Sequence, residues 1–122
     1  MVIYLLIEKF GMGIDIINVN RFSSKKLSEN KQFYRKIFTK KEINYCTKFK
    51  NPYTHFAGKF ALKEAVIKAL NKKIGLLEIE TFHKNNIPYV KLKNYDNFSI
   101  ASISHEENVA VAVFLIELGT KK

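Results

Sequence analysis

The feature that most constrains how this chain can fold is the stretch HFAGKFALKEAVIKAL, residues 55–70. Alanine recurs at every fourth position, which on a helix gives one narrow stripe of small side chains that another element can approach closely (Ala57, Ala61, Ala65 and Ala69). Larger apolar side chains widen this stripe into a core-facing surface (Leu62, Val66 and Leu70). Gly58 costs a helix ~1 kcal/mol relative to alanine, so we expect a close contact there. The pattern predicts a long central helix.

A second line on the same helix carries charges that packing does not need. Phe60, Glu64 and Lys68 also recur every fourth residue, so a carboxylate and an ammonium lie one turn apart beside an aromatic ring. Two interpretations are open. The pair is either a solvated surface ion pair worth ~0.3 to 0.5 kcal/mol or part of a chemical site, and the helix alone favours the surface pair.

Size and charge describe a single basic domain, residues 1–122. Its hydrophobic content of 47% and charged content of 26% are typical of soluble globular proteins. The net charge is +10, and because only Arg21 and Arg35 are arginines, the excess is almost all lysine. Lysines suit phosphates or an acidic partner better than bidentate base recognition. Charge alone does not choose among nucleic acid, an acidic protein and a phosphorylated small molecule.

Two features bear on location. Cys46 is the only cysteine, so no internal disulfide can form, and no zinc-binding spacing is present. We therefore expect a reducing, cytoplasmic environment and a buried, unreactive Cys46. Residues 1–10 begin with an apolar run that is too short to span a membrane, and we expect an N-terminal extension or a strand.

Residues 11–20, GMGIDIINVN, have the composition of a buried strand. Asp15 lies inside its apolar run. A carboxylate in such a strand is costly to bury unless it is hydrogen-bonded or bound to a cation. The alternative is a half-exposed strand with Asp15 facing water, and the strand by itself leaves both open.

The other elements give the fold class. Residues 21–49 have helical periodicity, and Thr39 with Glu42 forms a capping box. Asn51 and Pro52 are expected to begin the long helix, and Asn71 to lie near its end. Four segments then alternate with a period of two and predict strands joined by short turns (76–82, 89–92, 98–104 and 109–118). Helices followed by an antiparallel meander make an α+β fold.

Three stretches, in order along the chain, resemble one known family. GMGIDIINVNRF (11–22), KIFTKKEINY (36–45) and FAGKFALKEAVIKAL (56–70) resemble the signature blocks of holo-acyl-carrier-protein synthase, the small bacterial-type 4′-phosphopantetheinyl transferase. SISHEENVAVAV (102–113) resembles the last strand pair of that family. The resemblance implies the 4′-phosphopantetheinyl transferase fold, with a long central helix packed on an antiparallel sheet.

The resemblance also implies a metal site. Asp15 and Glu64 match the family's two carboxylate ligands of a divalent cation. Two carboxylates cannot complete the octahedron of Mg²⁺, so the ion would keep waters and take oxygens from the diphosphate of coenzyme A. Lys68 matches a lysine that stabilises or protonates the departing phosphate. The base that accepts the serine proton would be Glu64 or a water on the metal.

Other correspondences concern coenzyme A and the partner. Lys59 stands where the family usually has arginine, which keeps a charge for phosphate but loses the bidentate fork. His105 matches a histidine placed against a coenzyme A phosphate, with a solvated turn histidine as the alternative. Arg21 matches an arginine that pairs with an acidic helix of acyl carrier protein. The segment Asn71-Lys72-Lys73 replaces a glycine-rich turn of the family.

The reaction implied is transfer of 4′-phosphopantetheine from coenzyme A to a serine of apo acyl carrier protein, with release of 3′,5′-ADP, in support of fatty acid biosynthesis. Family members of this size form homotrimers with sites between subunits, and we expect neither a membrane nor a nucleic acid as partner. Two alternatives remain. One is a basic nucleic-acid-binding α+β module with lysines on phosphates and aromatics on bases, although no known motif of that class is present. The other is a family member that has lost activity.

Overall fold

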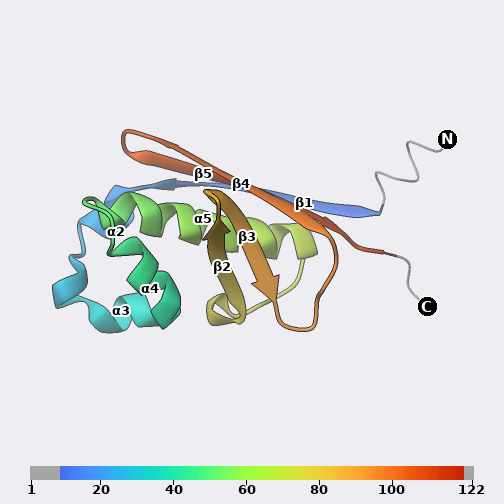
Figure 1. Ribbon diagram of the computed structural model, residues 1–122, viewed down its shortest axis with the longest axis horizontal. Coiled ribbons are helices and arrows are strands. Elements are labelled where there is room, and N and C mark those ends of the chain that lie inside the picture. Colours follow the sequence, from blue (N-terminus) through green and yellow to red (C-terminus); the bar gives the residue numbers. More distant parts are fainter. Residues whose placement is uncertain (1–8, 120–122) are drawn as a thin grey trace.

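The computed structural model describes residues 9–119, so the expectation for the first eight residues lies outside the described part. Figure 1 shows the elements along the chain. Their bounds are β1 (Phe10–Asn18), α2 (Asn20–Ser23), α3 (Lys31–Arg35), α4 (Lys40–Cys46), α5 (Pro52–Leu70), β2 (Ile79–Lys84), β3 (Ile87–Leu92), β4 (Ser99–Glu106) and β5 (Val109–Glu117). Two 3₁₀ turns, Leu27–Glu29 and Leu76–Glu78, complete the path. The α+β class is confirmed.

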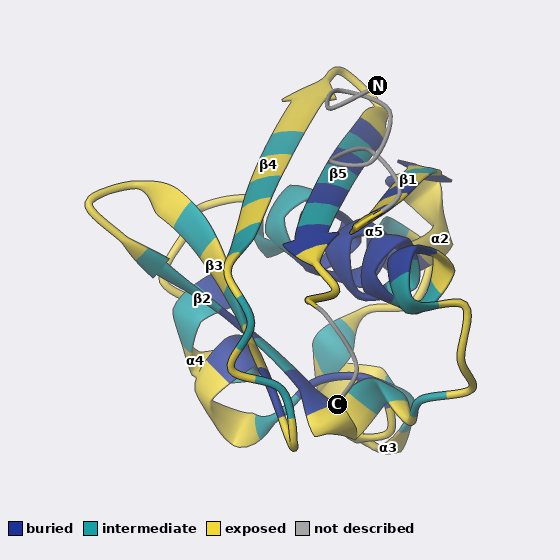
Figure 2. Ribbon diagram, turned by 90° about the vertical axis from the view of Figure 1, so that its right-hand side faces the viewer, coloured by how far each residue is buried: buried dark blue, intermediate teal, exposed yellow. Residues whose placement is uncertain are grey.

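The central helix α5 begins and ends where the sequence predicts. The Asn51 side chain accepts a hydrogen bond from the amide of Tyr53, and Pro52 occupies the first turn, where its missing amide hydrogen costs nothing. Asn71 closes the helix in the left-handed conformation, with φ at 52°. Most of α5 between these caps is buried, as the dark blue of its ribbon in Figure 2 shows.

The alanine stripe of α5 packs directly on strand β1. A Cβ atom added to Gly13 would overlap the carbonyl oxygen of Ala65, and one added to Gly11 would overlap that of Ala69. Small residues on both sides therefore bring strand and helix into backbone contact. Gly58 makes the expected close approach on another face, where an added Cβ would lie 3.0 Å from Ile103.

The sheet against α5 has the strand order β1-β5-β4, with both pairs antiparallel. In Figure 1 these strands lie along the length of α5. One face of the sheet is buried against the helix, with side chains that are at most 6% exposed (Ile17, Ala110, Ala112, Phe114 and Ile116). This packing holds Asp15, which lies between Gly13 and Ile17 on that face of β1, towards α5.

The opposite face of the sheet is apolar but uncovered. Met12, Ile14 and Ile16 of β1 are 65%, 58% and 65% exposed, and Ile100 of β4 is 53% exposed. The strand register aligns them with the outward side chains of β5 between them (Val111, Val113 and Leu115). We call this surface the outer sheet face. An apolar area of this kind is typical of an interface between proteins.

The second half of the chain departs from the predicted meander in two respects. Residues 76–78 form a 3₁₀ turn, so β2 starts three residues later than expected. The hairpin β2–β3 is a separate two-stranded sheet and does not pair with β4. Pro88 lies within β3, and a proline has no amide hydrogen for a neighbouring strand, which favours an edge position.

The segment before α5 forms a small aromatic cluster. The rings of Phe22, Tyr34 and Phe38 pack within 6.2 Å of one another. The capping box predicted at Thr39 and Glu42 is present with both reciprocal hydrogen bonds. Cys46 is fully buried as expected, and burial raises the pKa of its thiol to about 12, so it is not a nucleophile.

Candidate functional site

Asp15 and Lys68 meet at the edge of α5. The Lys68 ammonium donates to Asp15 Oδ1 at 2.9 Å and to the carbonyl oxygen of Ile14 at 2.9 Å. The Asp15 side chain is only 14% exposed, so the alternative of a water-facing Asp15 is wrong. Its second oxygen, Oδ2, is buried and has no hydrogen-bond partner. A buried carboxylate oxygen without a partner is costly and marks a place for a cation.

Glu64 lies one turn before Lys68 on the same line of α5. Gly11 contacts Ala69 and Gly13 contacts Ala65, so the strand runs antiparallel to the helix. The same progression sets Asp15, two residues further along β1, beside the turn of α5 that carries Glu64. Across residues 9–119 the ion pairs are Glu42–Lys63 and Asp15–Lys68. The solvated Glu64–Lys68 pair is therefore not formed.

Asp15 and Glu64, which we call the acidic pair, supply only some of the ligands that a divalent cation needs. Among the described residues, no group of three or more His, Cys, Asp or Glu side chains could hold a metal ion. Asp15 and Glu64 are therefore at most two protein ligands. That number suits Mg²⁺, which keeps waters and binds substrate phosphates more readily than a full protein cage. The unpartnered Oδ2 of Asp15 is the feature that favours such an ion.

Arg21 lies at the other end of the Phe60–Glu64–Lys68 line. Its guanidinium lies over the Phe60 ring, 4.9 Å from the centroid, and remains exposed. The contact holds the arginine at the surface one turn from Glu64. An acidic partner that met Arg21 would therefore lie next to the acidic pair.

Lys59 differs from its expected role at a coenzyme A phosphate. The residue is 1% exposed, and its ammonium donates to the hydroxyl and carbonyl oxygens of Thr81 at 3.0 and 3.1 Å. It also lies 4.6 Å from the centre of the Tyr45 ring. Burial lowers the pKa of Lys59. An amine enclosed in this way has no free face for a phosphate, so the coenzyme A assignment of Lys59 is withdrawn.

His105 lies in an open cavity of about 240 Å³. The cavity is lined by all three histidines and by aromatic and small residues (Tyr45, Phe49, His55, Gly58, His83, Asn86, Ile103 and His105). The strand register aligns Asp15 of β1 and Ile103 of β4 with Ala112 of β5 between them, and His105 lies two residues beyond Ile103. His105 therefore lies in the same sheet as Asp15, two strands away with β5 between them, at the end of β4.

Two aromatic stacks shape this histidine cavity. The Tyr45 and His83 rings lie parallel at 4.9 Å, and the Phe49 and His55 rings stack at 3.7 Å. Burial lowers the pKa of His83 to about 4, helped by the positive charge of Lys59 and by His55. Burial also lowers the pKa of His55, with His105 as the next contribution. Neutral rings at physiological pH suit stacking with a flat ligand group.

Sequence reasoning missed most of the cavity. His55 and His83 lie on different elements with no shared spacing, and only the fold brings them to His105. It also missed that Glu42 forms a buried ion pair with Lys63, because the capping box already explained Glu42. Asp15 was found from the sequence because it lies inside an apolar run of β1 and because the family resemblance matched it to a metal ligand.

Comparison with known proteins points to one family. A family model described as the 4′-phosphopantetheinyl transferase superfamily matches residues 11–114. A holo-[acyl-carrier-protein] synthase of Thermodesulfovibrio yellowstonii is 43% identical over 111 residues, which cover 87% of this chain and 96% of that protein.

Solved structures give the same result. The holo-(acyl-carrier-protein) synthase of Bacillus anthracis, in complex with coenzyme A (3′,5′-ADP), superposes with a TM-score of 0.77 at 30% identity and covers 89% of this chain and 96% of that one. The Helicobacter pylori enzyme, in complex with coenzyme A, gives a TM-score of 0.76 at 31% identity, with coverages of 87% and 99%.

Proposed function

Because this chain belongs to the holo-acyl-carrier-protein synthase family of 4′-phosphopantetheinyl transferases, we propose that it transfers 4′-phosphopantetheine from coenzyme A to a serine of apo acyl carrier protein. The serine Oγ forms a new bond to the β-phosphorus. The bond from that phosphorus to the bridging oxygen breaks, and 3′,5′-ADP leaves with the electron pair. The observation that carries the proposal is the buried, unpartnered oxygen of Asp15 between Lys68 and the turn of Glu64.

Asp15, Glu64 and Lys68 each have a defined task in the proposed reaction. Asp15 and Glu64 would hold a Mg²⁺ ion, which when bound neutralises charge on the diphosphate. Glu64 is also the candidate base for the serine proton. The Lys68 side chain is 54% exposed, so its ammonium can reach the departing phosphate and stabilise the charge that develops there.

Arg21 is the proposed contact for the carrier protein. It is exposed and held over Phe60, one turn of helix from Glu64. An acidic helix that paired with Arg21 would bring its neighbouring serine towards the acidic pair. The net charge of +10 would speed this encounter.

The active assembly is a homotrimer in this proposal, with sites between subunits. One observation supports more than one copy. The outer sheet face exposes a contiguous apolar surface. A second copy would cover the apolar face and supply the missing wall around a ligand as large as coenzyme A.

The cellular role follows from the reaction. We place the protein in the cytoplasm, where it would activate the carrier protein of fatty acid biosynthesis. In the described part of the chain, no helix combines the length and apolar composition needed to cross a membrane. The nucleic-acid alternative is not retained, because an acidic carrier protein and coenzyme A account for the basic surface.

The test is direct transfer by the wild-type protein. Apo acyl carrier protein is incubated with coenzyme A, Mg²⁺ and the enzyme, and its mass is followed, with a carrier variant lacking the acceptor serine as the control. We expect the mass of one phosphopantetheine group to be added and an equal amount of 3′,5′-ADP to be released. Chelation of divalent ions should stop the reaction. No gain in mass would overturn the proposed activity, and full transfer under chelation would overturn the role of the ion.

A further inference from the structure

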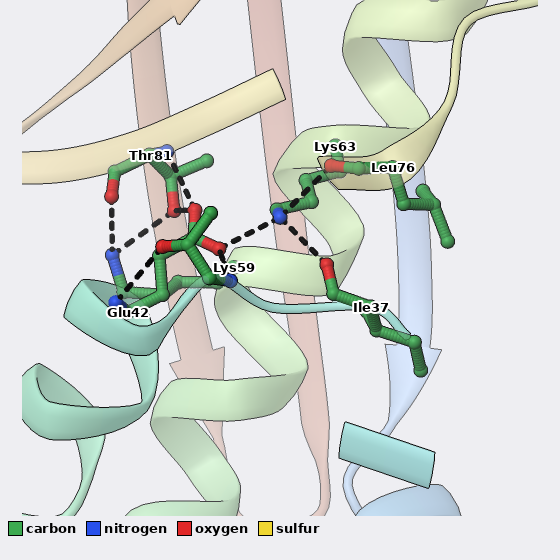
Figure 3. Close-up of polar contacts among 7 residues, drawn as sticks. Ile37, Glu42, Lys59, Lys63, Leu76 and Thr81 are labelled. Carbon is green, nitrogen blue, oxygen red and sulfur yellow. Dashed lines mark hydrogen bonds and ion pairs between the residues drawn. The ribbon is translucent and has the colours of Figure 1, made fainter. Parts of the chain in front are cut away.

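A buried polar network joins α5 to four other positions in the chain, two before the helix and two after it (Figure 3). We call it the Lys63 anchor; it comprises Glu42 of α4, Lys59 and Lys63 of α5, Thr81 of β2, and the carbonyl groups of Ile37 and Leu76. None of its four polar side chains is more than 3% exposed. The reaction as described above does not use any of them.

Each hydrogen of the Lys63 ammonium has an acceptor. Its ammonium donates to the Ile37 carbonyl at 2.7 Å, to Glu42 Oε1 at 2.7 Å and to the Leu76 carbonyl at 3.0 Å. An ammonium has three hydrogens, so all are used. The three acceptors come from separate segments before and after α5, and their geometry fixes where this side of the helix can lie.

Both carboxylate oxygens of Glu42 likewise accept hydrogen bonds. Its Oε1 accepts from the Thr39 amide and from Lys63, and its Oε2 accepts from the amide and hydroxyl of Thr81 at 2.7 Å each. One carboxylate thus caps α4, pairs with α5 and fixes the start of β2. Lys59, one turn before Lys63, donates to Thr81 as well.

The anchor lies beside the proposed site on the same helix. Lys59 and Lys63 form one line along α5, and each directly precedes a member of the Phe60–Glu64–Lys68 line. Neighbouring positions on a helix are about 100° apart around its axis. The buried lysines and the residues of the proposed site therefore keep a fixed angle to one another, and a rotation of α5 moves both sets together. Any turn of α5 about its axis would break bonds of the anchor and move Glu64 and Lys68.

Stability alone does not explain such a network. Replacing a buried ion pair with apolar side chains of similar volume is often neutral or stabilising. We propose that Lys63 and Glu42 are positioning residues, which fix the rotation of α5 and thereby hold Glu64 and Lys68 against Asp15. This inference depends on the proposed transfer reaction.

The rotation of α5 must be held within a few degrees for the site residues to stay in place. A side chain extends to about 5 or 6 Å from the helix axis, so a rotation of about 10° moves its end by about 1 Å. A misplacement of about 1 Å can cost about a hundredfold in rate. Loss of the anchor should therefore affect chemistry and metal binding even when the fold survives.

The decisive variant removes both charges together, Glu42→Gln with Lys63→Met, because either change alone leaves a buried charge unpaired. We expect a folded protein whose kcat falls about tenfold to a hundredfold and whose Mg²⁺ dissociation constant, measured by calorimetry with coenzyme A present, rises several-fold. The KM for carrier protein should stay within about twofold, because Arg21 lies outside the anchor.

Leu62→Ala is the matched control. Leu62 neighbours Lys63 on α5 and is fully buried, but it makes no polar contact with the anchor. This variant should lower the Tm while keeping kcat and the Mg²⁺ dissociation constant within about threefold of wild type. A folded double variant with equally normal values would overturn the positioning role.

If the double variant does not fold, Thr81→Val tests the positioning role instead. Valine keeps the shape of Thr81 but removes the hydroxyl that joins Glu42 to Lys59. We expect a smaller loss of kcat and of Mg²⁺ affinity, in parallel. A lowered Tm with unchanged kcat would overturn the inference. A wild-type enzyme without activity would instead overturn the proposed function itself.

Discussion

The buried carboxylate of Asp15 connects local structure to chemistry at the scale of single residues. Strand β1 is apolar and packs on α5, so an acidic side chain there needs compensation. Lys68 compensates one oxygen and leaves the other without a partner. The site is thus half satisfied by the chain, and the proposed substrate and ion complete it.

The role of Lys68 gives a prediction for kinetics. Lys68→Ala should lower kcat more than it weakens coenzyme A binding, because charge on the leaving phosphate grows towards the transition state. We expect a cost of ~2 to 4 kcal/mol in the barrier, as for the loss of one preorganised donor. The measurement is steady-state kinetics beside a thermal melt. Lys72→Ala is the control, since Lys72 contacts the hydroxyl of Tyr95 instead. An unchanged kcat would reduce Lys68 to a structural partner of Asp15.

Individual residues differed in how far the sequence could reveal them. Asp15 stood out because its burial conflicts with its charge. The partner of Lys68 could not be predicted, because the sequence shows its helix neighbour Glu64 and not Asp15, which lies fifty-three residues away. The resemblance implied that Lys59 contacts a coenzyme A phosphate, and only its tertiary environment shows that Thr81 and Tyr45 enclose it.

At the scale of elements, hydrophobic periodicity and helix caps were sufficient to predict α5 and the strands β1, β4 and β5 from the sequence. Both ends of α5 carry local signals in Asn51 and Asn71, so tertiary contacts were not needed to find them. The separation of the β2–β3 hairpin was not predicted, since pairing between strands depends on contacts distant in sequence. Pro88 was the available signal that β3 would be an edge.

The hairpin strand β2 also gives a prediction for pH. Burial lowers the pKa of His83 to about 4, whereas the unfolded chain has the ordinary value near 6.5. Between these values the unfolded state binds a proton that the folded state does not, so stability should fall as the pH drops from about 6.5 towards 4. Thermal melts of His83→Phe across this window should show a flatter dependence. His105→Gln, at an exposed position, is the control, and an equal slope in His83→Phe would contradict the assignment.

At the scale of the whole molecule, the outer sheet face predicts association. Ile14→Asp places a charge in the middle of this face, so it should shift the protein from the proposed trimer towards monomer and reduce transfer activity, because each proposed shared site is then incomplete. Light scattering measures the mass. Leu77→Asp is the matched control, since Leu77 is 49% exposed on the turn before β2, beside α4 and away from that face. A wild-type monomer, or full activity in monomeric Ile14→Asp, would contradict the shared site.

The overall charge predicts how the partner is recognised. Arg21→Glu should raise the KM for carrier protein much more than the KM for coenzyme A, and added salt should slow association with the wild-type enzyme. Arg35→Glu makes the same change in net charge at an exposed arginine remote from α5's charged line. If the two variants behave alike, net charge rather than Arg21 would determine the encounter.

The most direct test of the proposed site is Mg²⁺-dependent transfer by Asp15→Asn and Glu64→Gln. Each change keeps the shape of the side chain but removes one anionic ligand from an ion with few protein contacts. We predict a fall of at least about a hundredfold in turnover with an unchanged fold by circular dichroism, whereas the exposed control Asp96→Asn should behave as wild type. Turnover near the wild-type rate in both variants, still dependent on Mg²⁺, would contradict the site.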